Sequence, residues 1–174
     1  MKCDILKQKN AIKCNKSISF ENNGVQNQQS KNFIQIVEDA ALAVENGKKH
    51  SHQWRIKNCY LEKFKEKVCS NIDYLEKAFS FDEIHCIVKK SKAYGIGELA
   101  IYDTAVRIGN FKKMYPDKIY LHCGTKKGAE KLLGRKIKKK YITKEELKGK
   151  LPPKILELSC DDIETYLCVN KKNF

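Results

Sequence analysis

Apolar side chains recur at helical spacing from residue 32 onward. In the segment Asn32–Glu45 one helix face carries Phe33, Ile36, Val37, Ala40, Ala41 and Val44. The dipeptide Asn46-Gly47 follows directly and predicts the end of this helix. Segments 58–68 and 71–79 show the same period through Leu61, Phe64, Val68, Ile72, Leu75 and Phe79. The pattern predicts three amphipathic helices.

The next stretch predicts two helices joined by a tight turn. The sequence Ser80-Phe81-Asp82-Glu83 is typical of a capping box, and it opens a segment whose apolar side chains share one face. Gly95 and Gly97 then stand one residue apart, and a helical run follows them as far as Gly109. Glycines allow backbone conformations that other residues avoid, so we expect both to shape the turn.

Three more helices are predicted after this pair, and no segment shows the pattern of a strand. Thr125 is placed to cap a helix that stops at Gly134, Thr143 begins a second capping box, and Ser159 opens the last helix. We therefore predict an all-α protein with a single helical domain over residues 31–174. Residues 1–30 show no sustained period and are expected to form a flexible or loosely packed arm.

The run Ala93-Tyr94-Gly95-Ile96-Gly97-Glu98 resembles the turn of the helix-hairpin-helix motif, here at about residues 81–108. In that family of DNA-binding proteins the turn commonly has the sequence Leu-Pro-Gly-apolar-Gly and grips phosphates through backbone amides. The resemblance implies DNA contacts by Lys92, Tyr94, Gly95, Ile96, Gly97 and Glu98. The alternative is a plain connection between two helices.

A second segment, residues 119–134, resembles the part of helix-hairpin-helix DNA glycosylases that carries the catalytic Asp. In this chain His122 or Leu121 occupies that position. The resemblance implies a DNA-binding protein that excises a damaged or modified base. Asp103, His52 and His122 are the predicted catalytic residues, provided that they converge on one cleft. The alternative for Asp103 is an ordinary ion pair with Arg107, four residues later on the same helix.

Positive charge is concentrated after the predicted turn. The chain has a net charge of +14, and residues 107–154 hold 16 basic and 4 acidic side chains. Such a cluster favours a polyanionic partner, and we predict DNA, as a duplex. The predicted phosphate contacts in this stretch are Lys126, Lys127, Lys131 and Arg135. The alternative is a soluble, lysine-rich surface without a partner.

The segment 48–56 combines basic, aromatic and imidazole side chains. Trp54 and Arg55 suit a nucleic-acid surface, with the indole stacked on a base, although a buried Trp54 is equally compatible with the sequence. His50 and His52 alternate like two metal ligands, but no third or fourth ligand follows at a telling spacing. We therefore predict no metal and no other cofactor.

The eight cysteines form no Cys-x-x-Cys pair, and no secretory signal precedes them. We expect reduced, mostly buried thiols in a cytoplasmic protein, and no apolar run is long enough to cross a membrane. Two alternatives to the enzyme stay open. They are a non-catalytic DNA-binding or adaptor protein and a helical protein-interaction module.

Overall fold

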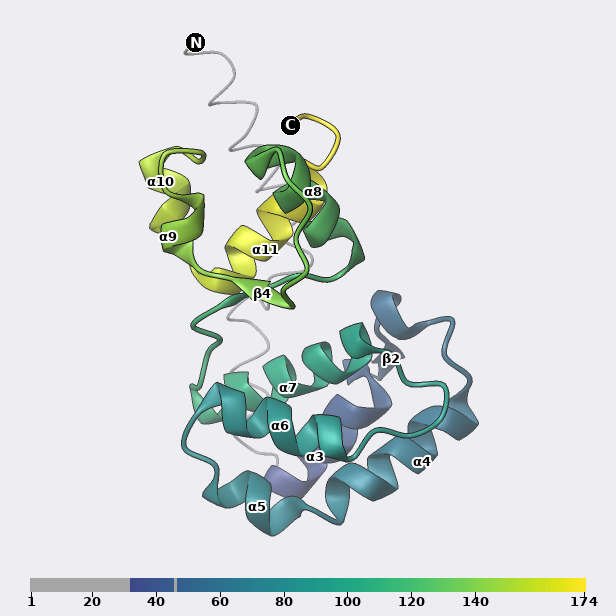
Figure 1. The fold of residues 1–174 in the computed structure, drawn as a ribbon. Helices are drawn as coiled ribbons and strands as arrows, with labels where there is room; N and C mark the ends of the chain where they lie inside the picture. The colour runs from purple at the N-terminus through teal and green to yellow at the C-terminus, as the bar shows by residue number, and fades with distance from the viewer. Residues whose placement is uncertain (1–31, 46) are drawn as a thin grey trace. The chain divides into compact units, whose positions relative to one another are not determined.

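The computed structural model describes residues 32–45 and 47–174, and these form two compact units, residues 32–116 and 117–174 (Figure 1). We expected one domain over residues 31–174. The chain divides at Pro116 because each part buries its own apolar side chains, with Phe64 and Ile101 in the first core and Ile163 in the second. The predicted N-terminal arm lies outside the described residues.

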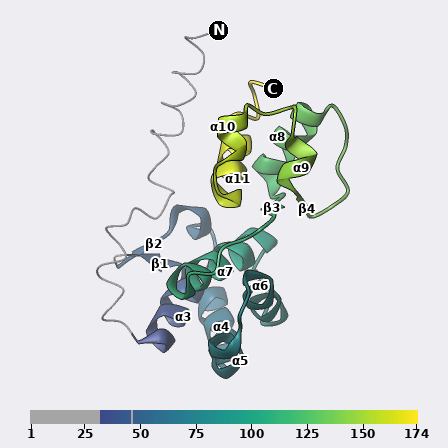
Figure 2. The same cartoon turned by 90° about the vertical axis from the view of Figure 1, so that its left-hand side faces the viewer.

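The N-terminal unit is a helical bundle with one small β-ribbon. Its elements in order are α3 (Phe33–Leu42), β1 (Val44–Glu45), β2 (Lys48–Lys49), the 3₁₀ turn η1 (Ser51–Gln53), α4 (Asn58–Cys69), α5 (Ile72–Lys77), α6 (Phe81–Lys90) and α7 (Glu98–Lys112). Helix α3 packs against α4 and α7, and α6 packs against α7. Both views show α6 and α7 side by side (Figures 1 and 2).

The first predicted helix ends earlier than its apolar pattern indicates. Ala43 takes the left-handed conformation with φ of 57°, and Val44 then pairs with Lys49 across an antiparallel ribbon. Gly47, at φ of 74°, supplies the turn of this ribbon. The prediction that the chain contains no strand is therefore wrong here. The ribbon matters for the site, because its second strand leads directly into η1.

The C-terminal unit is built around two packed helices. Its elements are β3 (Ile119–Tyr120), α8 (Cys123–Leu133), β4 (Tyr141–Ile142), α9 (Lys144–Leu147), α10 (Pro153–Leu156) and α11 (Cys160–Val169). Strands β3 and β4 pair antiparallel, and α8 packs on α11. Gly128 permits this contact, because a Cβ there would lie only 2.1 Å from the Leu167 carbonyl oxygen.

The described residues are mainly α-helical, as predicted, and most of the predicted helix starts are confirmed. Ser80 accepts a hydrogen bond from the Glu83 N–H at 3.3 Å, and Ser159 caps α11 in the same way. Thr143 and Glu146 form the predicted capping box. These starts were predictable because a cap involves residues only three positions apart.

Three local predictions are wrong. Thr125 does not cap a helix: it is buried inside α8, and its hydroxyl lies 3.3 Å from the Glu164 carbonyl oxygen. Phe79 is 79% exposed instead of lying in the core. The cysteines Cys59, Cys69, Cys86, Cys123, Cys160 and Cys168 are free thiols, as expected, but half of them are exposed. The N-cap of α8 is His122, three residues before Thr125.

Candidate functional site

The turn between α6 and α7 depends on glycine at Gly95. This residue has φ of +81°, a region that residues with a Cβ seldom adopt. A Cβ at this position would also lie 2.3 Å from Cδ2 of Tyr60 on α4. Two features of the fold therefore require glycine at position 95: the positive φ angle and the Tyr60 ring packed against it.

Gly97 differs from Gly95, and the expectation that both glycines need unusual backbone angles is wrong for it. Its φ of −91° and ψ of 170° are open to any residue. A Cβ there would meet no described atom within 4 Å other than those of its two chain neighbours. Gly97 is the N-cap of α7, and in the described part of the chain no side chain caps this helix end. The N-cap of this 15-residue helix is therefore a residue without a side chain.

The side chains around this turn have different environments. Tyr94 is 82% exposed, with its ring edge-on to Tyr60, whereas Ile96 is only 3% exposed. Ile96 can therefore meet DNA only through its backbone. The Glu98 carboxylate lies 3.4 Å from the Lys92 ammonium and 3.9 Å from the Lys89 ammonium. Two lysines thus balance the acidic residue in the first turn of α7.

The structure brings together two of the three predicted catalytic residues. Asp103 lies on α7 and His52 on η1, and the His52 Nδ1 is 3.1 Å from the Asp103 Oδ2. The His52 side chain is 35% exposed and that of Asp103 is 14% exposed. The 3₁₀ turn after the β-ribbon thus directs an accessible imidazole onto a mostly buried carboxylate.

Two buried residues, Gln53 and Arg107, hold this pair in place, and of these the sequence pattern indicated only Arg107. Gln53 is 1% exposed, and its Nε2 donates to the same Asp103 oxygen at 2.5 Å. Arg107 donates to the Gln53 Oε1 at 3.0 Å and to the Ala40 carbonyl at 3.3 Å. Arg107 therefore bonds to Gln53, and the direct Asp103–Arg107 ion pair considered from their spacing is not formed among the described residues.

The network shifts the pKa values of its members. Burial opposes ionisation of Asp103, but the hydrogen bond from His52 and the charge of Arg107 outweigh it and lower the pKa of the carboxyl. The hydrogen bond to Asp103 raises the pKa of His52. Burial and the nearby Arg107 charge lower the pKa of His50, which favours its neutral imidazole. The cluster therefore combines a carboxyl and an imidazole, Asp103 and His50, whose pKa values are lowered with a second imidazole, His52, whose pKa is raised.

His122, the third predicted catalytic residue, belongs to the C-terminal unit. Its Nε2 lies 3.9 Å from the Glu164 Oε1, and its ring stacks on Tyr120 with centroids 6.4 Å apart. Glu164, which the sequence did not single out, is thus an acidic neighbour of His122 within that unit. The convergence of His122 with His52 and Asp103 stays a prediction.

The remaining predicted DNA contacts are spread over both units. Trp54 is 64% exposed, and the Arg55 guanidinium carbon lies 5.0 Å from its ring centre, so the alternative of a buried Trp54 is wrong. Lys126, Lys127, Lys131 and Arg135 lie on α8 or just after it. Of these, Lys126 is half-buried, the others are exposed, and Arg135 pairs with Glu146 at 3.4 Å.

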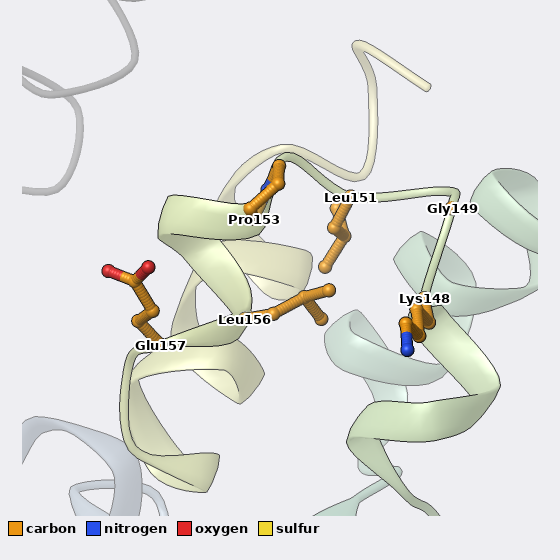
Figure 3. Close-up of a pocket in the computed structure, with 6 residues that line it drawn as sticks. All are labelled: Lys148, Gly149, Leu151, Pro153, Leu156 and Glu157. Atoms are coloured by element: carbon orange, nitrogen blue, oxygen red, sulfur yellow. The ribbon is translucent and has the colours of Figure 1, made fainter.

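A separate hollow of about 700 Å³ opens beside α9 and α10 (Figure 3). It is lined by Lys148, Gly149, Leu151, Pro153, Leu156 and Glu157. Leu151 and Leu156 point toward each other in the close-up, while Glu157 points away from them (Figure 3). None of the predicted catalytic residues lines this hollow, so it is separate from the predicted chemistry.

No protein-family model, curated protein or solved structure matches the chain. Within the described part of the chain, every helix is too short or too polar to span a bilayer. Two features of the described residues bear on function, the turn at Gly97 and the His52–Asp103 cluster.

Proposed function

We propose that this chain is a DNA-binding protein that holds backbone phosphates at the turn between α6 and α7, in the manner of a helix-hairpin-helix motif. The geometry of Gly97 carries the proposal, because its backbone is extended and the space around its Cα is open. The fold does not require a glycine at this point. Phosphate binding does require one, because the phosphate must come close to the backbone N–H groups at the start of the helix, and a side chain would keep it away.

The start of α7 suits an anion for two reasons. A helix of 15 residues presents unpaired N–H groups and the positive end of its dipole at Gly97. Lys89 and Lys92 lie close to the Glu98 carboxylate and offset its negative charge at the helix start. Exposed Tyr94 lies beside this point and offers a ring to a base or a sugar.

The charge of the C-terminal unit supports the same partner. Residues 117–174 hold 15 basic and 8 acidic side chains, against 14 and 11 in residues 32–116. We propose that the N-terminal unit contributes backbone N–H groups and that the C-terminal unit contributes Lys126, Lys127, Lys131 and Arg135. Contacts between these basic side chains and DNA phosphates release counterions from the DNA, and they make binding depend on salt concentration.

The test is a fluorescence-anisotropy titration of a labelled DNA duplex at increasing NaCl. Four phosphate contacts predict a plot of log K against log salt with a slope of about −3.6, and each Lys→Ala substitution among them should reduce the slope by about 0.9. Lys63→Ala, an exposed lysine on α4, is the matched control and should leave the slope unchanged. No binding at low salt, or a slope near zero, would remove DNA from the proposal.

The hydrogen bond between His52 and Asp103 favours a second candidate, release of a damaged or modified base. Excision of a base leaves positive charge on the sugar, and the carboxylate of Asp103 can stabilise it. The enzyme must also turn its target base out of the stack, and exposed Tyr94 or Trp54 can fill the gap. DNA binding without base release would favour the adaptor, and absence of DNA binding would favour the protein-interaction module.

A further inference from the structure

His50 adds a second imidazole to the pair formed by His52 and Asp103. One ring nitrogen of each histidine and one carboxylate oxygen lie within 4.8 Å of one another. The two histidines are near neighbours in the chain, whereas Asp103 comes from α7, about 50 residues later. The fold thus supplies the third ligand that the spacing of the histidines did not indicate.

Local backbone structure fixes the two histidines. The His50 N–H donates to the Ala43 carbonyl at 2.8 Å, which ties it to the end of α3. The His52 N–H then donates to the His50 Nδ1 at 3.3 Å, and the two rings meet edge to face at 5.0 Å. Both imidazoles are therefore positioned by the ribbon and η1 and do not sit on a loose loop.

We propose that His50, His52 and Asp103 bind a divalent transition-metal ion of the zinc class. Two imidazole nitrogens and one carboxylate oxygen form the kind of three-ligand set that leaves one tetrahedral position open to water or a substrate. Ligand atoms about 2.0–2.1 Å from Zn²⁺ lie roughly 3.4 Å apart in a tetrahedral site. The ligand atoms therefore need to approach one another by up to about 1.4 Å, which rotation of the partly exposed His52 ring can supply.

The residues around Asp103 hold its carboxylate in a fixed orientation, as metal ligands commonly require. Gln53 donates to the Asp103 carboxylate and is itself held by Arg107, so the carboxylate is oriented by a buried second layer of hydrogen bonds. The positive charge of Arg107 opposes a cation nearby, and it limits the affinity. Its guanidinium is, however, bonded to Gln53 and to the Ala40 carbonyl, which leaves the carboxylate free of a direct ion pair with it.

The test uses the full chain after treatment with EDTA, and Zn²⁺ alone as the probe. Calorimetry should show one equivalent of Zn²⁺, with affinity reduced roughly 100-fold or more in His50→Gln, His52→Gln and Asp103→Asn. Asp103→Asn keeps an oxygen that can accept the Gln53 hydrogen bond. His85→Gln, on α6, is the matched control and should bind as the wild type does.

Free thiols can also bind the added metal. The absorption spectrum of bound Co²⁺ distinguishes binding by thiols from binding by His50, His52 and Asp103. Co²⁺ bound by two imidazoles and a carboxylate lacks the intense near-ultraviolet band of a Co²⁺–thiolate bond. In the wild-type protein, Zn²⁺ should also shift the NMR ring resonances of His50 and His52 but leave those of His85 in place. This measurement needs no variant to fold.

Three results would overturn the proposal. They are absence of Zn²⁺ binding at micromolar metal, unchanged binding in all three variants, and a thiolate band in the Co²⁺ spectrum. The proposal does not depend on DNA binding, which is measured separately by anisotropy. A metal held by His52 and Asp103 competes with the hydrogen bond between them, so base release is assayed both with and without Zn²⁺.

Discussion

Alanine should destabilise the protein at Gly95 and leave its stability almost unchanged at Gly97, the two glycines of the turn. In Gly95→Ala the new side chain meets both a left-handed backbone and the Tyr60 ring. The backbone strain costs about 1–2 kcal/mol. Overpacking against the ring costs about 1–3 kcal/mol more. We expect the free energy of unfolding of Gly95→Ala to fall by roughly 2–5 kcal/mol.

Gly97→Ala is the matched control, because the same methyl group enters open space at an ordinary backbone angle. Alanine at the N-cap gives a less stable helix than glycine does, by just under ~1 kcal/mol. It also restricts the unfolded chain, which stabilises the folded state by about 0.4–1 kcal/mol. These effects nearly cancel, so the free energy of unfolding should stay within about 0.5 kcal/mol of the wild type.

Urea denaturation followed by far-ultraviolet circular dichroism measures both variants. A second comparison isolates the ring, because Tyr60→Ala in the Gly95→Ala background removes the clash but leaves the backbone strain. The double variant should therefore show a favourable coupling of about 1–3 kcal/mol. Equal stabilities for Gly95→Ala and Gly97→Ala would refute the assignment of different roles to the two glycines.

Three further predictions concern the rest of the chain. The Lys112 ammonium donates to the carbonyls of Leu75, Glu76 and Ala78 at 2.6–2.7 Å, so Lys112→Met should lower the free energy of unfolding by roughly 1–3 kcal/mol in urea denaturation, and an unchanged midpoint would contradict this contact. Gly128→Ala should destabilise the C-terminal unit by about 3 kcal/mol, because its methyl group meets the Leu167 carbonyl, and amide hydrogen exchange in α8 and α11 should rise. On duplexes with a panel of damaged or modified bases, alkali-revealed base release should fall about 10²- to 10⁴-fold in Asp103→Asn and in His122→Ala, and release that survives both substitutions would exclude the predicted catalytic residues.

Features set by neighbouring residues in the chain could be predicted from the sequence. The caps at Ser80, Thr143 and Ser159 are formed with residues three positions away, and all three are present. The glycine turn between two helices was likewise visible as Gly95 and Gly97. Helical periodicity failed at Val44 because a two-residue strand can continue the apolar spacing of a helix without being part of it.

Features set by distant residues could not be predicted. The spacing of Asp103 and Arg107 predicts an ion pair between them. Instead Gln53, on η1, accepts a hydrogen bond from Arg107 and donates one to Asp103. Thr125 has the sequence context of a cap, yet its hydroxyl is buried against Glu164 on α11. The meeting of His52 with Asp103 was predicted only as a possibility, because it depends on how the β-ribbon places η1 beside α7.

Phosphate binding at the turn between α6 and α7 is tested most directly by the affinity of Gly97→Val for duplex DNA, measured by anisotropy at low salt beside its urea denaturation curve. Valine fills the open space in front of the first N–H groups of α7, where we place the phosphate. We expect a folded protein whose affinity for DNA falls at least about 10-fold, since the helix-terminal N–H groups are then screened from the anion. Unchanged affinity in a folded Gly97→Val protein would contradict this expectation and would leave the glycines as residues of a plain turn.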